Sequence, residues 1–217
     1  DERMVRCQCV YERMYEAFIE GITGLSNREY TFESFDLKLN PRMKPAYDAA
    51  VAFSKGQCGR DNNDVINPAW LVLQAKTKGC GKTHLALACI RDRIILDHAR
   101  VLFYTGADLV SALHASLDKE AEVRTPEFTQ RLKDVDVLIL DDLGLGDGRE
   151  WVDSQIETIL HSRAMREYDT LITTNLDGIK SERIVSRMSD RTLCRLVICE
   201  GVRDVRPLLR PQTKGAP

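Results

Sequence analysis

The stretch WLVLQAKTKGCGKTHLALA, residues 70–88, decides the fold of this chain. It opens with four apolar residues, which predict a buried strand over 70–73. A long apolar run then predicts a helix over 82–98. Between them, KTKGCGKT (76–83) follows the pattern G-x-x-x-x-G-K-[ST], which forms a phosphate-binding loop when it stands between a strand and a helix. The stretch therefore predicts an α/β fold with a nucleotide loop after its first long strand.

The residue types in this loop suit the chemistry of a polyphosphate. Gly79 and Gly81 allow backbone N–H groups to turn toward phosphate oxygens, and the start of the helix adds partial positive charge. Lys82 would neutralise the outer phosphates, and the Thr83 hydroxyl would ligate Mg²⁺. We therefore expect ATP or ADP and Mg²⁺ as cofactors. The expected nucleotide contacts are Gly79, Cys80, Gly81, Lys82, Thr83 and His84.

One position departs from the pattern, because Lys76 stands where the first glycine is expected. A lysine fits there only if its backbone φ is negative. Two other interpretations of the loop follow from this departure. It is either a chance occurrence of G-x-G-K-T, or a degenerate loop that binds nucleotide poorly.

Apolar strands and helices alternate along the rest of the chain. Further strands are predicted over 101–104, 135–140, 170–174 and 196–199, and further helices over 107–117, 150–167 and 181–188. This order predicts a parallel sheet with helices on both faces. Upstream of residue 70, helices are predicted over 10–24 and 41–55, and a polar, turn-rich loop over 57–68.

Two of the predicted strands end in polar residues suited to phosphate chemistry. VDVLILDDLG (135–144) ends in an acid pair, in which Asp141 would hold Mg²⁺ and Asp142 would act as general base toward an attacking water. Because strand carboxyl ends meet at one edge of a parallel sheet, Asn175 would reach the same water or the γ-phosphate. The plainer alternatives are an Asp-Asp turn after a core strand and an asparagine that starts a turn.

Arg183 and Arg187 lie four residues apart in SERIVSRMSD (181–190), on one face of a short predicted helix. Either arginine would suit a finger that reaches the γ-phosphate on a neighbouring subunit. A solvated basic face is the alternative. Arg163 is a weaker candidate for the same role.

Composition limits the class of protein. The chain has 217 residues, 43% apolar residues and a net charge of −2, which fits one substantial soluble domain with a short appendage. It contains no run of about 18 apolar residues, so no membrane span is expected. Seven cysteines, several in apolar stretches, suit buried free thiols in a reducing cytosol. Any nucleic-acid contact needs a local basic patch. The candidates, which have no aromatic platform and are as compatible with a solvated charged face, are Lys119, Arg124, Arg131 and Lys133.

Taken in order, several motifs resemble one family. They are the phosphate loop, LILDDLG (138–144), LHSRAMREYDTLITTNL (160–176), ERIVSRM (182–188) and G-x-x-D-V-R (201–206). The chain resembles the AAA+ ATPases of the DnaC and IstB type over roughly residues 28–206. The resemblance implies a three-layer P-loop fold with a five-stranded parallel sheet in the order 5-1-4-3-2 and an absent or very short lid. It also implies that Asp141 and Asp142 are the Mg²⁺ and catalytic acids.

For the remaining site residues, the resemblance places Asn175 at the sensor-one position and Arg187 at the arginine-finger position, with Arg183 beside it. It implies a self-associating oligomer with shared ATP sites, binding of single-stranded DNA, and a place in the cytoplasm of a bacterium or a phage-infected cell. We expect ATP hydrolysis to be slow and to be stimulated by oligomerisation or DNA. We expect a helical amino-terminal stub over 1–27, the ATPase domain over 28–206 and a flexible tail over 207–217.

The amino-terminal stub carries Cys7 and Cys9, which are too few for a tetrahedral zinc site. Because the chain begins at Asp1, we expect upstream sequence to be missing, and zinc only in a longer protein.

Four functions remain open. The leading expectation is an ATP-dependent loader of a hexameric replicative DNA helicase. The alternatives are a helper ATPase that delivers target DNA to a transposase, a non-hydrolysing nucleotide-dependent scaffold, and a small-molecule kinase. The polar end of the strand over 170–174 and the short tail argue against the kinase.

Overall fold

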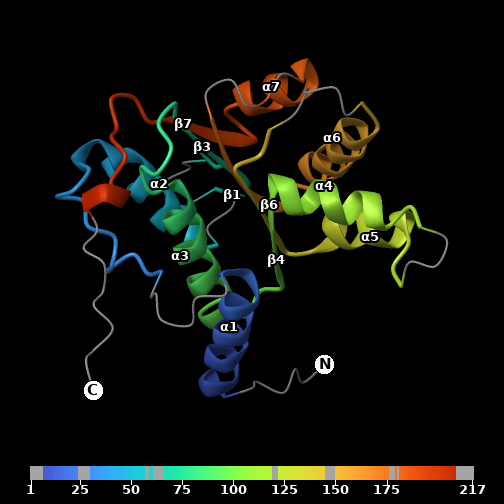
Figure 1. Ribbon diagram of the computed structural model, residues 1–217, viewed down its shortest axis with the longest axis horizontal. Coiled ribbons are helices and arrows are strands. Elements are labelled where there is room, and N and C mark those ends of the chain that lie inside the picture. The colour runs from blue at the N-terminus through green and yellow to red at the C-terminus, as the bar shows by residue number, and fades with distance from the viewer. Residues whose placement is uncertain are drawn as a thin grey trace.

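The computed structural model describes residues 7–23, 30–56, 59–60, 66–118, 122–144, 150–175, 179 and 181–208. Five parallel strands form its central sheet (Figure 1). They are β3 (Trp70–Gln74), β4 (Val101–Thr105), β5 (Val137–Asp141), β6 (Asp169–Thr174) and β7 (Cys194–Ile198). Their spatial order is β4-β5-β6-β3-β7, which is 2-3-4-1-5 in chain order of the five, so the predicted topology is confirmed.

Two groups of helices cover the two faces of the sheet. One group packs with the first apolar cluster and comprises α1 (Gln8–Thr23), α2 (Lys44–Ser54) and α3 (Lys82–Ile95). The other packs with the second cluster and comprises α4 (Gly106–Ala115), α5 (Thr125–Asp134), α6 (Glu150–Met165) and α7 (Glu182–Ser189). Short 3-10 turns occupy η1 (Pro41–Met43) and η2 (Arg206–Leu208). The sheet is thus the middle of three layers, as expected (Figure 1).

Side-chain alternation along β3 explains how one short apolar run fills both clusters. Leu71 and Leu73 point into the α1–α3 cluster, whereas Trp70 and Val72 point into the α4–α7 cluster. All four side chains are buried, as a strand in the interior of a parallel sheet requires. This packing fixes where β3 ends, and therefore where the phosphate loop begins.

The structure corrects the sequence-based expectations in several places. Helix α5 was not predicted, because its sequence TPEFTQRLKD has only two strongly apolar residues, Phe128 and Leu132. Val135, assigned to a strand, instead follows α5 as its C-cap and is buried, so β5 begins two residues later. The stretch predicted as a loop over 57–68 contains a two-residue antiparallel ladder, β1 (Gly59–Arg60) with β2 (Ile66–Asn67).

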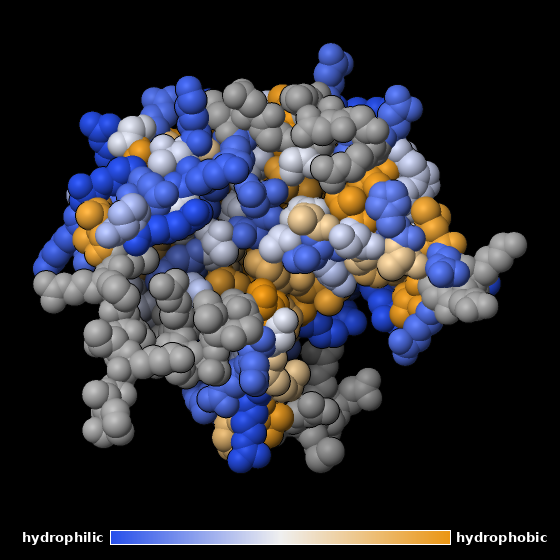
Figure 2. Space-filling view, in the orientation of Figure 1, coloured by the Kyte–Doolittle hydropathy of each residue, from blue (hydrophilic) through white to orange (hydrophobic). Residues whose placement is uncertain are grey.

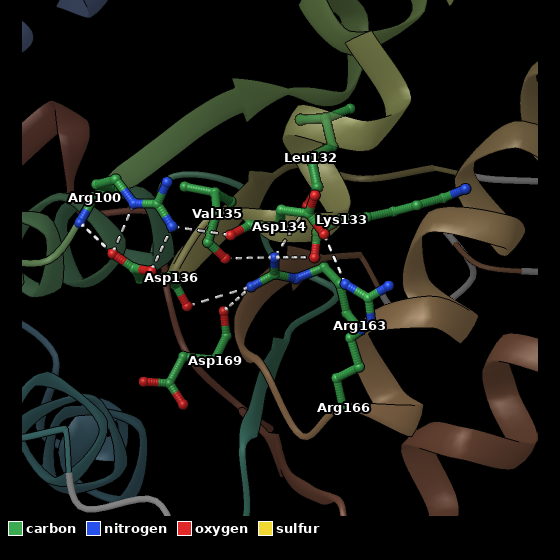
Figure 3. Close-up of polar contacts among 9 residues, drawn as sticks. All are labelled: Arg100, Leu132, Lys133, Asp134, Val135, Asp136, Arg163, Arg166 and Asp169. Carbon is green, nitrogen blue, oxygen red and sulfur yellow. Dashed lines mark hydrogen bonds and ion pairs between the residues drawn. The ribbon is translucent and has the colours of Figure 1, made fainter. Parts of the chain in front are cut away.

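A buried arginine ties α6 to the amino ends of the strands (Figure 3). Arg163 has 0% exposure, and its guanidinium donates to the carbonyl oxygens of Leu132, Val135 and Asp169 at 2.9, 2.8 and 2.6 Å. It also donates to Thr170 Oγ1 at 3.0 Å. Burial lowers the pKa of the guanidinium to about 10, so it remains charged at neutral pH. A fully buried, fully bonded side chain cannot reach another subunit, so the interpretation of Arg163 as a finger is wrong.

Within the described part of the chain, no helix is long and apolar enough to cross a membrane. On the face shown in Figure 2, apolar side chains reach the surface between α4 and α6. Beyond β7, the described residues contain only the short turn η2 and no helical lid.

Candidate nucleotide-binding site

A cavity of 1110 Å³ opens at the carboxyl ends of the sheet strands. Its floor is the phosphate loop between β3 and α3, and the ends of β4, β5 and β6 form one side. The segments over 30–40 and 205–206 form the other side. The sequence-predicted residues that line it are Gly79, Cys80, Gly81, Lys82, Thr83, His84, Asp141, Asp142 and Asn175. The fold therefore brings together three motifs that lie far apart in the sequence.

The glycines of the loop occupy backbone conformations that side chains disfavour. Gly79 has φ 68° and Gly81, the N-cap of α3, has φ 111°. A Cβ on Gly79 would lie 2.1 Å from Asp204 Oδ1, and one on Gly81 would lie 2.7 Å from Phe35 Cε2. Both positions thus favour glycine for their conformation, and Gly81 also for space, because the Cβ on Gly79 would meet only the movable end of an exposed side chain.

Lys76 fits its position without strain. Among the described non-glycine residues, only His98, Asp142 and Glu167 have positive φ. Lys76 therefore meets the condition set by the sequence, and its side chain is exposed. The conformational reason to regard the loop as degenerate is removed. Lys82, in contrast, is buried, with Nζ 3.4 Å from the carbonyl oxygen of Thr77 in the same loop.

The first acid of the pair lies in a hydroxyl network. Asp141 is 5% exposed, and its Oδ2 accepts from Thr83 Oγ1 at 2.8 Å while its Oδ1 accepts from Thr173 Oγ1 at 2.6 Å. Burial raises the pKa of this carboxyl, although the two hydroxyl bonds and the Lys82 charge oppose the shift. A carboxylate beside a threonine hydroxyl is a set of hard oxygen donors, which suits Mg²⁺. The residues present therefore fit the expected ion.

The second acid lies in a strained turn. Asp142 has φ 51°, and its backbone N donates to Thr173 Oγ1 at 2.9 Å. Its Oδ1 accepts from Asn175 Nδ2 at 2.9 Å. The other side-chain atom of this amide, Asn175 Oδ1, is buried and has no hydrogen-bond partner among the described residues. Asp142 and Asn175 thus lie together as predicted, with an acceptor left for a ligand or water.

An aromatic wall flanks the loop, which sequence reasoning did not identify. Tyr30 and Phe35 pack edge-on against His84, with ring centroids 5.4 and 5.2 Å away. His84 Nε2 lies 2.9 Å from the Thr31 carbonyl oxygen, which joins this segment to the start of α3. Tyr30, Phe35 and His84 line the cavity, so it offers a planar apolar group a surface beside the phosphate loop. The sequence over 27–36 has no regular period, so nothing in it pointed to this wall.

The segment after β7 covers the outer side of the loop. Thr77 Oγ1 donates to the Val202 carbonyl oxygen at 3.0 Å, and Val205 N donates to the Gly79 carbonyl oxygen at 3.1 Å. Arg206 follows and lines the cavity; it is the one arginine of the described residues to do so. Its motif, G-x-x-D-V-R, contributed to the family resemblance, but no site role was predicted for it.

The two candidate finger arginines lie on α7, outside the cavity of their own chain. Arg183 is 85% exposed and lies 3.6 Å from Glu157 Oε2. Arg187 is half-buried and contacts His161 Nδ1 of α6. Neither arginine joins the acids and the loop within one chain.

The candidate DNA contacts lie on or beside α5. Arg124 and Arg131 are exposed and Lys133 is half-buried, whereas Lys119 lies outside the described residues. An aromatic pair that the sequence analysis missed lies nearby on α4 and α6. Trp151 is 37% exposed, and its ring centroid is 6.0 Å from that of His114.

Cys7 lies just before α1, and Cys9 lies in the first turn of this helix. Both side chains are exposed, and their Sγ atoms are 3.0 Å apart. Within the described ranges, no group of three or more His, Cys, Asp or Glu side chains comes together to hold a metal ion.

Comparison with known proteins agrees with this geometry. The family pattern of IstB-like ATP binding proteins matches residues 63–197, which include the loop, the acids and both arginines of α7. The chain belongs to the family of IstB-like ATP binding proteins. The description of this family names ATP binding, which agrees with the phosphate loop at the floor of the cavity.

Individual relatives extend the comparison. The uncharacterized protein YdaV of Escherichia coli (strain K12) is 37% identical over 120 residues, which cover 51% of this chain and 46% of YdaV. The replicative helicase loader DnaC of Buchnera aphidicola subsp. Baizongia pistaciae (strain Bp) is 32% identical over 115 residues, with the same shares covered. The chain therefore spans about half the length of these curated relatives.

Solved structures share the fold. AMPPCP-bound DnaA from Aquifex aeolicus superposes with a TM-score of 0.64 at 25% identity, covering 80% of this chain and 50% of that one. The DnaC helicase loader superposes with a TM-score of 0.60 at 22% identity, covering 79% and 97%. This likeness establishes the AAA+ P-loop fold.

Proposed function

We propose that this protein is an ATP-dependent DNA replication helicase loader, which binds MgATP and single-stranded DNA and loads a hexameric replicative helicase. The observation that carries the proposal is the joining of the phosphate loop, the acid pair and Asn175 in one cavity of an IstB-like ATP binding protein. Sequence relatives named replicative helicase loader DnaC support the choice of partner.

Each group in the cavity has a proposed task in ATP hydrolysis. The loop N–H groups and Lys82 hold the phosphates, and Thr83 and Asp141 hold Mg²⁺. When bound, the ion neutralises charge on the phosphate oxygens. Asp142 orients the attacking water and accepts its proton, and Asn175 fixes that water through its free Oδ1. Arg206 adds a positive charge from the same chain.

A second subunit completes the proposed site. Arg187 acts as the finger on a neighbour's γ-phosphate, with Arg183 beside it, and this requires a self-associating oligomer. The position of both arginines outside their own cavity supports the proposal. Arg187 then exchanges its His161 contact for phosphate when subunits assemble.

Single-stranded DNA is proposed to pass along the surface of α4, α5 and α6. Arg124 and Arg131 supply positive charge, and the exposed Trp151 beside His114 supplies an aromatic surface on which a base can stack. The apolar side chains that reach the surface between α4 and α6 support this location (Figure 2). The structure of DnaA bound to single-stranded DNA shares the fold of this chain.

The division of the chain also remains a proposal. We propose an amino-terminal helical piece over 1–27 that contacts the partner, an ATPase domain over 28–206 and a tail over 207–217. A zinc ion on Cys7 and Cys9 would need two further ligands.

The test is helicase loading by the full-length protein onto closed circular single-stranded DNA. DNA-bound replicative helicase is counted after a high-salt wash, with ATP, without nucleotide and with the Asp142→Asn variant. We expect loading above the no-loader background that needs ATP, and hydrolysis that Asp142→Asn abolishes. ATP binding with no hydrolysis in wild type or variant would favour the scaffold. Recovery of a transposase in place of a helicase in a pull-down would favour the transposition helper.

A further inference from the structure

We infer that Thr173 is a positioning residue of the nucleotide site, whose hydroxyl sets Asp141 and Asp142 and thereby the gain in nucleotide affinity that Mg²⁺ provides. The inference rests on the proposed function, because it assigns a task within the same cavity. Thr173 is 1% exposed and lines that cavity, yet neither the sequence motifs nor the family relationship assigned it a role.

The position of Thr173 follows from where the β5–β6 ladder stops. Paired residues along these strands end at Leu140 and Ile172, one residue before the acid pair. Beyond that point, one backbone bond, from Leu143 N to the Thr173 carbonyl oxygen at 2.9 Å, is joined by side-chain bonds. Thr173 Oγ1 bonds Asp141 and the backbone of Asp142, whereas Thr174 Oγ1 donates to the Leu143 carbonyl oxygen at 2.7 Å. Of the two hydroxyls, that of Thr173 therefore contacts both acids, and that of Thr174 contacts neither.

The direction of these hydrogen bonds is unambiguous. A backbone N–H can only donate, so Thr173 Oγ1 accepts from Asp142 N at 2.9 Å. The single hydroxyl proton is then directed at Asp141 Oδ1, 2.6 Å away. One hydroxyl thus serves the metal carboxylate as donor and the neighbouring backbone as acceptor. A side chain without a hydroxyl removes this bonding partner from both groups.

Two consequences for the site follow. With Oδ1 held by Thr173, Asp141 keeps its Oδ2 toward Thr83 Oγ1, 2.8 Å away, so the two oxygens expected on Mg²⁺ face each other. Asp142 is held at φ 51°, in the left-handed region that side-chain-bearing residues other than Asn and Asp rarely adopt, and its backbone N is bonded there by Thr173 Oγ1. In this way Thr173 orients the metal ligand and the candidate base without contacting the nucleotide.

A purely structural role predicts a different outcome from a positioning role. If the hydroxyl only stabilised the fold, its loss would lower the melting temperature and weaken nucleotide binding equally with and without Mg²⁺. If it orients Asp141, its loss removes the part of the affinity that depends on the ion. Residues that orient metal ligands typically change metal affinity by about 10- to 100-fold.

The experiment measures the Kd of ADP by titration calorimetry in Mg²⁺ and in EDTA, for the full-length protein. We compare wild type, Thr173→Val, which removes the hydroxyl, and Thr173→Ser, which keeps it. The matched control is Thr174→Val, which removes a buried hydroxyl from the next residue of the same strand without touching either acid.

We divide the Kd of ADP in EDTA by the Kd in Mg²⁺, so that a larger ratio means a larger gain in affinity from the ion. We expect this ratio to fall at least about tenfold in Thr173→Val and to remain within about twofold of wild type in Thr173→Ser and Thr174→Val. Affinity in EDTA stays unchanged in all of them. An unchanged ratio in Thr173→Val overturns the inference. If that variant does not fold, Thr173→Cys replaces it, because a thiol is a weak donor of similar size; a ratio equal to that of Thr173→Ser then overturns it. Wild type that fails to bind ADP refutes the proposed function instead.

Discussion

Substitution of Arg163 by methionine tests the claim that this arginine holds the fold and takes no part in nucleotide chemistry. Methionine keeps the apolar stem but removes the guanidinium, so the carbonyl oxygens of Leu132, Val135 and Asp169 lose their closest donor (Figure 3). An unpaired buried polar group costs about 1 to 3 kcal/mol, so three cost about 3 to 9 kcal/mol. Removing the desolvated charge returns several kcal/mol of this, which leaves a net loss of about 3 kcal/mol.

The matched control is Arg166→Met, just beyond the end of the same helix. Arg166 is half exposed and pairs with Asp134 at 2.6 Å, and an exposed pair of this kind contributes little to stability. Thermal unfolding followed by circular dichroism measures both variants. We expect Arg163→Met to melt about 6 to 12 °C below wild type, from about 2 to 4 °C per kcal/mol for a chain of this size. At low temperature it should still bind ATP. Equal stability of the two variants would refute the reasoning, and so would selective loss of ATP binding by a folded Arg163→Met.

Three further predictions concern the cavity. Asp141→Asn should raise the stability of the nucleotide-free protein by about 1 kcal/mol, because it removes a buried charge at a functional site; an unfolding titration that shows a loss instead would contradict this. Burial raises the pKa of Asp141 in the folded protein. The stability gained from its protonated carboxyl is therefore present in acid, below the unfolded-state pKa, and is lost as pH rises through the raised pKa. The stability difference between wild type and Asp141→Asn should shrink toward acid pH. Gly79→Ala should weaken ATP binding severalfold in a fluorescence titration, because Gly79 has φ 68°, a conformation that costs a residue with a Cβ about 1 to 2 kcal/mol; affinity within about twofold of wild type would argue against the loop geometry. Lys76→Gly should leave the ATP affinity and the hydrolysis rate unchanged, since Lys76 is unstrained, and a large gain in an ATPase assay would mean that the lysine impairs the loop.

Much of the architecture follows from local sequence signals. The strands at 70–74 and 137–141 are each a run of four apolar residues followed by one polar residue, which is too short for a helix. The glycine loop also requires a strand before it and a helix after it. The order of the strands does not follow from such signals and came from the family resemblance. Helix α5 was not predicted, because Phe128 and Leu132 alone make too narrow an apolar stripe to distinguish a helix from a polar loop.

The parts of the site that the sequence did not reveal depend on distant contacts. Tyr30 and Phe35 form a wall only because α3 places His84 between them, about 50 residues along the chain. Arg206 enters the cavity because Val205 bonds back to the Gly79 carbonyl oxygen. No spacing within the sequence encodes these contacts. The interpretation of Arg163 as an arginine finger was wrong for a related reason. Only the fold shows that backbone carbonyl oxygens surround its guanidinium.

The acid pair illustrates the difference between residue identity and arrangement. Asp141 and Asp142 were identifiable from their place at the end of an apolar run. The hydroxyl of Thr173 that bonds both of them was visible only as one of three threonines in a strand. Its role depends on where the backbone ladder stops, which is a property of the paired strands and not of either sequence segment.

The central claim is that the cavity at the strand ends binds MgATP through the phosphate loop. The most direct test is titration calorimetry of ATP in the presence of Mg²⁺ with wild type and Lys82→Ala, each checked for folding by circular dichroism. The account predicts saturable one-site binding by wild type and an affinity at least about tenfold weaker for the variant, because the loop lysine neutralises the outer phosphates. Equal affinity of the two folded proteins, or no binding by wild type, would contradict the account.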